Sequence, residues 1–188
     1  EWESRQLRES FFKDYPILTI NNGIDTDIFR PQQERADEVR VKYHLGNGKI
    51  LLGVATAWGE RKGLSDYYKL RERLGEDYTI VLVGVPQSLK ESLPKGIIGL
   101  LRTDSIDELS LLYSTASIVM NLASAESFGK TTPEGLACGT PSIVYNCTAS
   151  PDLVDEKTGI VVEKGDIDAL EKAVYTITNW NREEAIKN

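Results

Sequence analysis

A loop framed by two glutamates has the residue types needed to bind a phosphorylated ligand. Glu126 and Glu134 are separated by seven residues, among them Gly129 and Lys130. The apolar residues 117–122 precede this loop and have the length and β-branched content of an interior parallel strand. Carboxylates that follow a buried strand lie at the edge of a sheet, where they can reach a ligand.

A helix is predicted directly after the loop. Thr131 or Thr132 can cap it, Pro133 lies in its first turn and Gly139 ends it. The free N–H groups and the dipole at the start of such a helix favour an anion, and phosphate is the usual occupant. The loop is therefore a predicted phosphate site.

The two glutamates differ in what else they could do. Glu134 stands three residues after Thr131, which is the spacing of a capping box, and on its own this structural role is the favoured interpretation. Its carboxylate could equally accept hydrogen bonds from two vicinal hydroxyls, as acidic residues do with ribose. Glu126 has no evident capping role, so we expect it to contact a ligand.

A basic pair, Arg61 and Lys62, follows the apolar residues 50–57 and precedes a predicted helix over residues 64–74. The helix dipole disfavours cations at that end. The arrangement is explained if a diphosphate bridges these side chains and nearby N–H groups. The alternative is that both are solvated surface charges.

Composition narrows the class of protein. The 188 residues, 40% of them apolar, are enough for one core. The net charge of -7 disfavours nonspecific binding to nucleic acid or to an anionic membrane. Two cysteines, Cys138 and Cys147, and one histidine, His44, do not make a disulfide framework, a zinc site or a histidine-based triad. We therefore expect no metal and no cofactor.

The chain carries no segment that predicts membrane insertion or secretion. No apolar run approaches the roughly 20 residues that cross a bilayer, and the charged first residues do not resemble a signal peptide. Because the first residue is Glu1 and not Met, we expect a fragment of a longer, cytoplasmic protein. Peripheral attachment of the full-length protein at the inner face of the membrane stays open.

Strands and helices alternate along the chain with short connections, which predicts an α/β fold with a Rossmann-like, doubly wound parallel sheet. We expect residues 1–14 to be a charged lead-in from a missing amino-terminal domain and residues 15–188 to form the Rossmann-like domain. The predicted strands are residues 17–20, 50–57, 79–84, 97–101, 117–122, 142–145 and 160–162.

The carboxyl ends of parallel strands share one edge, and ligands bind there. Neither a G-x-G-x-x-G fingerprint nor a P-loop occurs, so classical NAD binding and P-loop chemistry are not expected. Trp58 and Tyr113 are predicted to pack in the core. The shared edge should gather residues that are distant in sequence: Arg61, Lys62, Val85, Arg102, Thr103 and residues 126–131.

The run from Glu126 to Glu134, followed by Gly-Leu-Ala-Cys-Gly-Thr-Pro, resembles the E-x7-E signature of family 4 glycosyltransferases of the GT-B fold. The resemblance implies the carboxy-terminal, donor-binding domain of a two-domain enzyme, whose amino-terminal domain normally contacts the acceptor. Further segments resemble other blocks of that family: residues 22–25, 61–63, 82–84 and 159–162.

The resemblance also implies roles for single residues. Glu134 would hold the ribose hydroxyls and Glu126 the hydroxyls of the donor sugar. Lys62, with Arg61, would neutralise the diphosphate. Such enzymes retain anomeric configuration and need no bound metal ion. The remaining donor-binding residues would be Phe128, Gly129, Lys130 and Thr131 around the sugar and phosphates, and Val85, Arg102 and Thr103 around the base.

Two positions depart from the family pattern. The family commonly has an arginine five residues before the lysine, but this chain has Ala57 there, which leaves open whether Arg61 replaces it. Residues 148–152 stand where a glycine-rich turn usually precedes a Pro-Glu pair. Close backbone approach to a ligand in that loop is therefore also open.

The resemblance implies transfer of a hexose-type sugar, with retention, from a nucleoside diphosphate donor such as a UDP-sugar to a glycan or lipid-linked acceptor in polysaccharide biosynthesis. We expect the fragment alone to bind nucleotide weakly and to transfer little. The alternative is a non-catalytic module that binds a nucleotide or phosphosugar. A sugar-nucleotide 2-epimerase is disfavoured, because that reaction depends on histidine and on further carboxylates.

Overall fold

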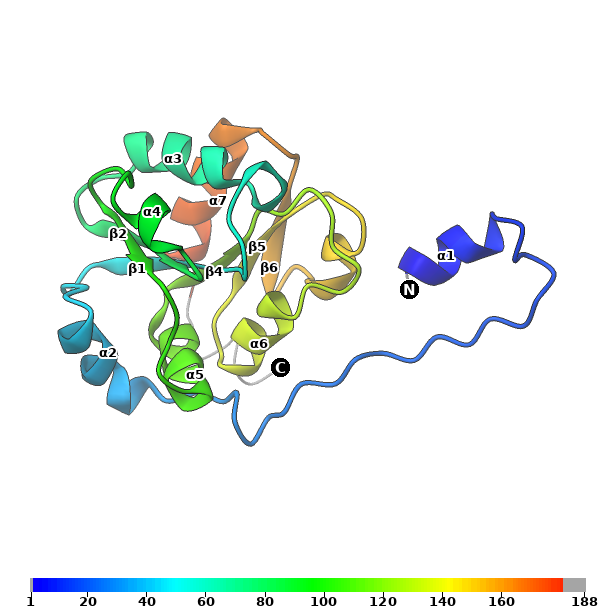
Figure 1. Cartoon of the computed structure of the whole chain (residues 1–188), viewed down its shortest axis with the longest axis horizontal. Helices are drawn as coiled ribbons and strands as arrows, with labels where there is room; N and C mark the ends of the chain where they lie inside the picture. The colour runs from blue at the N-terminus through cyan, green and yellow to red at the C-terminus, as the bar shows by residue number, and fades with distance from the viewer. Residues whose placement is uncertain (1, 181–188) are drawn as a thin grey trace.

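The computed structural model describes residues 2–180, which form an α/β body with an extended N-terminal segment (Figure 1). Neighbouring strands of the six-stranded sheet are parallel, in the order β3-β2-β1-β4-β5-β6. The predicted α/β fold with a doubly wound parallel sheet is confirmed. The strands are β1 (Lys49–Val54), β2 (Tyr78–Val83), β3 (Ile97–Leu100), β4 (Ile118–Asn121), β5 (Ser142–Tyr145) and β6 (Gly159–Val162).

Helices cover both faces of the sheet. The α3 and α7 helices pack together over one face, while α2, α5 and α6 cover the other (Figure 1). The α-helices are α1 (Trp2–Arg8), α2 (Ala36–Lys42), α3 (Leu64–Arg73), α4 (Gln87–Lys90), α5 (Ile106–Thr115), α6 (Thr131–Ala137) and α7 (Ile167–Ile177). The described residues also form three 3₁₀ turns: η1 (Gln33–Arg35), η2 (Glu60–Lys62) and η3 (Ser150–Leu153).

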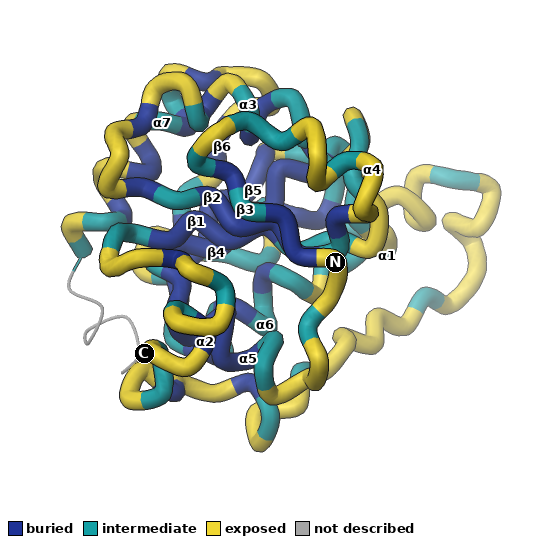
Figure 2. Tube along the Cα trace, turned by 60° about the vertical axis from the view of Figure 1, so that its left-hand side comes forward, coloured by how far each residue is buried: buried dark blue, intermediate teal, exposed yellow. Residues whose placement is uncertain are grey.

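The strands are buried on both sides. In β1, Ile50 and Leu52 belong to the core beneath α2 and α5, whereas Leu51 belongs to the core beneath α3 and α7. All three are at most 1% exposed. Figure 2 shows the strands as the buried centre of the body. Burial on both faces is why the strands read as continuous apolar runs.

Side-chain capping bonds stabilise the starts of two helices. At the start of α5, the Ser105 hydroxyl accepts a hydrogen bond of 3.1 Å from the Glu108 N–H. At the start of α7, the Asp166 carboxylate accepts one of 2.9 Å from the Ala169 N–H. Each side chain satisfies an N–H group that has no partner inside its helix.

The predicted cap of α6 is wrong. The residue before the helix is Lys130, whose side chain makes no capping bond. Thr132 is fully buried, and its hydroxyl instead accepts a hydrogen bond of 3.3 Å from the Asn121 side chain. Tertiary packing against β4 therefore directs this threonine into the core.

The predicted strand at residues 17–20 is also wrong. Leu18 and Ile20 are 83% and 82% exposed, and in the described part of the chain no strand pairs with this segment. An apolar run forms a strand only where a neighbour satisfies its backbone groups. Of the predicted lead-in over residues 1–14, α1 is helical and contacts the body through Arg5, which pairs with Asp152 at 3.1 Å.

Predicted and observed strand ends differ most in β1, which stops at Val54 and not at Ala57. Residues 55–57 are small and apolar enough to continue a strand, yet they leave the sheet and form the loop at its edge. Residues 1 and 181–188 of the predicted spans lie outside the described residues.

Substitution of Gly84 should destabilise the sheet edge. Gly84 follows β2 with φ +88°, and a Cβ there would lie 1.7 Å from the Ala55 carbonyl oxygen. We expect Gly84→Ala to lower the free energy of unfolding by more than about 2 kcal/mol, because a strained φ alone costs about 1–3 kcal/mol. Urea unfolding followed by circular dichroism measures the change.

Gly59→Ala is the matched control. Gly59 has an extended backbone with φ 173°, and a Cβ there would meet nothing within 4 Å. Equal losses of stability in the two variants would contradict the close approach of the loops after β1 and β2.

Candidate functional site

A pocket of about 790 Å³ opens where β1, β2 and β3 end, and the loop between β4 and α6 forms part of its wall. This volume lies within the range of about 300–1,000 Å³ that small-molecule sites occupy. The lining residues are Val54, Ala55, Thr56, Ala57, Trp58, Lys62, Val83, Gly84, Pro86, Leu101, Arg102, Thr103, Glu126, Gly129, Lys130 and Thr131.

The loops after β1 and β4 are held directly against each other. Gly63 has φ +70°, and a Cβ there would lie 2.4 Å from the Leu122 carbonyl oxygen. Two residues after Leu122, the Ser124 N–H donates a hydrogen bond of 2.9 Å to the Arg61 carbonyl. This backbone contact brings η2, and with it Lys62, alongside the loop that carries Glu126.

Lys62 and Glu126 form an ion pair inside the pocket. Their side chains are 20% and 16% exposed, so the pair is partly shielded from water. An ammonium has three donors and a carboxylate has two oxygens, so both groups keep capacity for further hydrogen bonds. An anionic ligand that entered the pocket would compete with Glu126 for Lys62.

Thr148 holds the backbone of Glu126 from a third loop. Its hydroxyl accepts a hydrogen bond of 2.8 Å from the Glu126 N–H and donates one of 2.7 Å to the Glu126 carbonyl. Thr148 has φ +48°, in the left-handed region that favours glycine. At the position of the expected glycine-rich turn, the chain therefore places a strained threonine that positions a pocket residue.

Glu134 does not form the capping box that its spacing favours. Its carboxylate accepts a hydrogen bond of 2.9 Å from the hydroxyl of Tyr113 on α5. Burial raises the pKa of Glu134 above its usual value, while the Tyr113 bond and the charge of Lys130 offset only part of this rise. Tyr113 itself packs in the core as predicted and also orients this carboxylate.

Seven residues of the predicted site line the pocket together: Lys62, Arg102, Thr103, Glu126, Gly129, Lys130 and Thr131. Four others do not line it. Arg61 is exposed, Val85 is fully buried in the core, and Phe128 and Glu134 are half-buried. Glu134 lies about one helical turn beyond Thr131. The functional roles predicted for the residues of both groups stay predictions.

Trp58 lines the pocket although only a packing role was predicted for it. Its ring contacts Tyr67 edge-on, with 5.4 Å between the centroids, and its indole N–H donates a hydrogen bond of 2.9 Å to the Val83 carbonyl. The Trp58 side chain thus packs against Tyr67 and also lines the pocket. The sequence feature that could have predicted this position is that Trp58 follows β1 in the same loop as Lys62.

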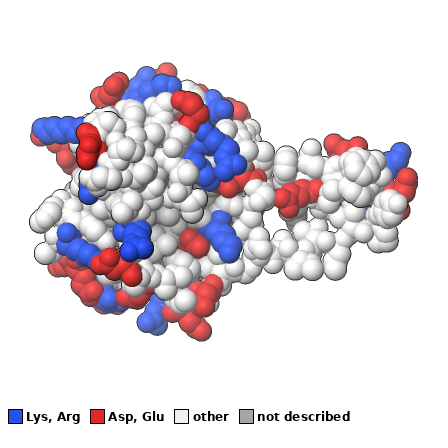
Figure 3. Space-filling model, in the orientation of Figure 1, with Lys and Arg blue, Asp and Glu red and all other residues white. Residues whose placement is uncertain are grey.

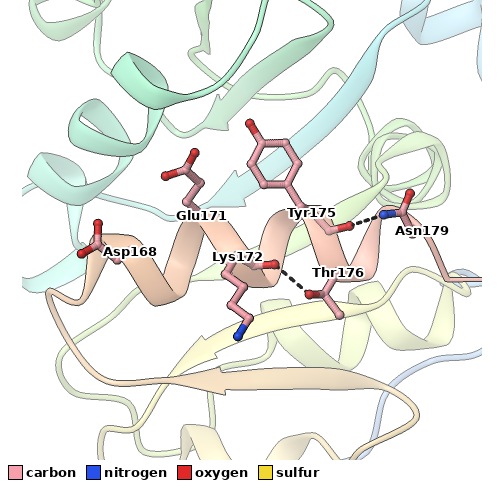
Figure 4. Close-up of a pocket in the computed structure, with 6 residues that line it drawn as sticks. All are labelled: Asp168, Glu171, Lys172, Tyr175, Thr176 and Asn179. Carbon is pink, nitrogen blue, oxygen red and sulfur yellow. Dashed lines mark hydrogen bonds between the residues drawn. The ribbon is translucent and has the colours of Figure 1, made fainter.

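A second, smaller hollow of about 380 Å³ lies on the outer surface of α7 (Figure 4). Its acidic residues, Asp168 and Glu171, both pair with Arg73 of α3. The Thr176 hydroxyl donates to a backbone carbonyl of its own helix. These polar groups join two helices or satisfy α7 itself, so this hollow is not the candidate site.

The surface carries both signs of charge. Figure 3 shows basic and acidic side chains interspersed over one face of the molecule. In residues 2–180, no group of three or more His, Cys, Asp or Glu is arranged to hold a metal ion. The same residues contain no helix long and apolar enough to cross a membrane.

Residues 49–179 match the sequence pattern of the family Glycosyl transferases group 1. The chain is 24% identical over 183 residues to the processive diacylglycerol alpha-glucosyltransferase of Acholeplasma laidlawii, covering 92% of this chain and 54% of that protein. It therefore spans about half the length of this relative.

Two solved structures share the fold. A glycosyltransferase from Rickettsia africae superimposes with a TM-score of 0.83 at 21% identity, over 99% of this chain and 55% of that one. HepE from Anabaena, in complex with UDP-glucose, gives a TM-score of 0.73 at 17% identity, over 89% of this chain and 52% of that one.

The raised pKa of Glu134 predicts how its replacement changes stability with pH. The folded protein binds this proton more readily than the unfolded chain, so the wild type loses stability as pH rises from the unfolded pKa of glutamate through the folded value. Glu134→Gln lacks this loss. Its free energy of unfolding should therefore rise relative to wild type across that window and stay higher at neutral pH.

Urea unfolding at acidic and neutral pH measures this difference. Glu76→Gln, which removes one carboxylate at an exposed position, is the control variant measured beside it. A stability difference between Glu134→Gln and wild type that does not change with pH would contradict the stated effect of burial.

Proposed function

The chain belongs to the family Glycosyl transferases group 1, and from this premise we propose that it is the donor-binding part of a family 4 retaining glycosyltransferase. The whole enzyme would transfer a hexose-type sugar from a nucleoside diphosphate donor to a glycan or lipid-linked acceptor. One observation carries the proposal: Lys62 and Glu126 pair inside a pocket that Gly129 and Lys130 also line.

The cations suit a diphosphate. Lys62 and Lys130 line the pocket from two different loops. A diphosphate presents several charged oxygens, and hydrogen bonds between ions of opposite charge are about twice as strong as neutral ones. Its binding would draw Lys62 away from Glu126.

The freed Glu126 carboxylate would then accept hydrogen bonds from hydroxyls of the donor sugar. The two bonds from Thr148 fix the Glu126 backbone, so the carboxylate moves only by rotation of its side chain. In the free and the bound states alike, the Lys62 ammonium has an anionic partner and the Glu126 carboxylate has hydrogen-bond donors. This is favourable because an unpaired, partly buried charge is costly.

Glu134 would bind the ribose hydroxyls. Its carboxylate is half-buried, lies just beyond Thr131 and is oriented by Tyr113. A carboxylate can accept from two vicinal hydroxyls at once. This role explains why the chain keeps a carboxylate whose burial raises its pKa.

In the transfer step, the oxygen of an acceptor hydroxyl forms a bond with the anomeric carbon while the bond between that carbon and the diphosphate oxygen breaks. Negative charge grows on the departing diphosphate, which takes up the proton of the acceptor hydroxyl. Lys62 would stabilise this charge, which is the contribution that positioned cations make in other active sites. Arg61, exposed beside Lys62, could approach the phosphates only by rotating toward the pocket. No bound metal is required by this scheme.

The nucleotide base and the acceptor are proposed from the similar proteins. UDP is the first choice of nucleotide because HepE from Anabaena, a structural neighbour, was solved with UDP-glucose. This chain spans about half of its A. laidlawii relative, so we propose that another part of the protein supplies the acceptor contacts. We place the whole enzyme in the cytoplasm, at the inner face of the membrane where the acceptor is lipid-linked.

A non-catalytic nucleotide-binding module is the second candidate. It is favoured by Ala57, which lines the pocket where the family commonly has an arginine, and by Arg61, which does not line it. Turnover by the full-length protein decides between the two. A full-length protein that binds the nucleotide but transfers no sugar would favour the module.

Nucleotide titrations test the donor site. Lys62→Ala should weaken UDP binding about tenfold or more, as expected for loss of a charged hydrogen bond, and leave uridine binding unchanged. Glu134→Ala should weaken both, because ribose is present in each. Calorimetry with UDP and GDP, and NMR titration with uridine, measure these affinities.

Lys95→Ala is the matched control, because Lys95 is an exposed lysine that precedes β3 and so lies at the opposite end of the strand from the pocket. It should bind UDP as wild type does. Failure of the wild-type chain to bind any nucleoside diphosphate would overturn the donor-site proposal.

A further inference from the structure

One wall of the pocket is anchored from outside it. Leu101, Arg102 and Thr103 line the pocket in the loop between β3 and α5. The next residue, Asp104, is held at two points. Its N–H donates a hydrogen bond of 2.6 Å to Glu108, and its carboxylate accepts one of 2.7 Å from the Lys42 ammonium.

Glu108 joins these contacts. Its side chain is 11% exposed, and its carboxylate accepts from the Lys42 ammonium, the Asp104 N–H and the Tyr43 hydroxyl. Burial raises the pKa of Glu108, but these hydrogen bonds together lower it by more, so the pKa lies below its usual value. At neutral pH the carboxylate is ionised and bound from three directions.

We call Lys42, Tyr43, Asp104 and Glu108 the α2–α5 latch. Lys42 ends α2 and Tyr43 follows it, while Glu108 lies in the first turn of α5. None of the four lines the pocket. The latch therefore ties the end of the pocket loop to α2, a helix that does not line the pocket.

A neighbouring ion pair shows what the latch does beyond joining helices. Arg35, which precedes α2, pairs with Asp107 of α5 at 3.1 Å. This pair connects the same region of the chain to α5, yet the side-chain hydrogen bonds of Asp107 come from Arg35 and not from the pocket loop. The two connections differ in whether they hold Asp104.

We propose that Lys42 and Glu108 are positioning residues that hold Arg102 and Thr103 in place for the nucleoside end of the donor. The inference rests on the proposed donor site. A loop that is already fixed loses less conformational entropy when a ligand binds, and this raises affinity without any new contact. The diphosphate end, bound from Lys62 and Gly129, does not depend on the latch.

The test compares two probes, UDP and inorganic pyrophosphate. Lys42→Ala and Glu108→Ala should weaken UDP binding about tenfold, the scale of lost preorganisation, and leave pyrophosphate binding unchanged. Glu108→Gln keeps an acceptor for the Asp104 N–H and should recover part of the UDP affinity. Asp107→Ala, the matched control, should bind both probes as wild type does.

Hydrogen exchange gives a readout that needs no ligand. Amides of residues 101–104 should exchange faster in Lys42→Ala than in wild type, and Asp107→Ala should leave them unchanged. Lys42 is 43% exposed at its side chain, so its replacement should not prevent folding. Circular dichroism and thermal unfolding of each variant verify this.

The outcomes separate this inference from the proposed function. Wild-type binding of UDP that Lys42→Ala and Glu108→Ala leave unchanged would overturn the latch alone. Equal weakening of UDP and pyrophosphate, or equal effects of Asp107→Ala and Lys42→Ala, would also overturn it. A wild type that binds neither UDP nor GDP would overturn the donor site and the latch together.

Discussion

The sheet buries both of its faces, and this constraint decides where the protein can place charged groups. Side chains of β1 such as Leu51 and Leu52 are fully enclosed by helices on either side. An ionised group placed there would lose its hydration without gaining a partner. The ends of the strands remain, where loops from four strands meet and where Lys62 and Glu126 can pair.

Close contact between backbones gives this edge its rigidity. Gly63 lies against Leu122, and Gly84 lies against Ala55, at distances that leave no room for a side chain. The pocket walls are thus set by main-chain packing, while the side chains that line them determine what binds. Loops that carry function on a rigid frame are a general feature of α/β proteins.

The fold was predictable from sequence because burial on both faces leaves long apolar runs. The segment at residues 17–20 misled, since strand formation depends on a partner that local sequence does not reveal. The pocket edge was predictable from topology alone, as Lys62, Glu126 and Arg102 show. Which of the two basic side chains lines the pocket was not predictable, because the turn of η2 decides that it is Lys62 and not Arg61.

Glu134 shows a second limit of sequence analysis. Its spacing from Thr131 fits a capping box, and local geometry offered no reason to choose otherwise. The hydroxyl that binds it belongs to Tyr113, 21 residues earlier on another helix. A tertiary partner of this kind overrides a local pattern and becomes visible only when the helices are packed.

Thr148 combines a conformation suited to glycine with a hydroxyl that glycine lacks. Glycine at this position would relax the backbone but remove the acceptor of the Glu126 N–H and one of the donors to the Glu126 carbonyl, which also accepts from the Ala149 N–H. An unstrained backbone at residue 148 and a fixed position for Glu126 therefore require different residues at this one position. Local strain at Thr148 thus accompanies a fixed backbone at Glu126, about which only the side chain rotates.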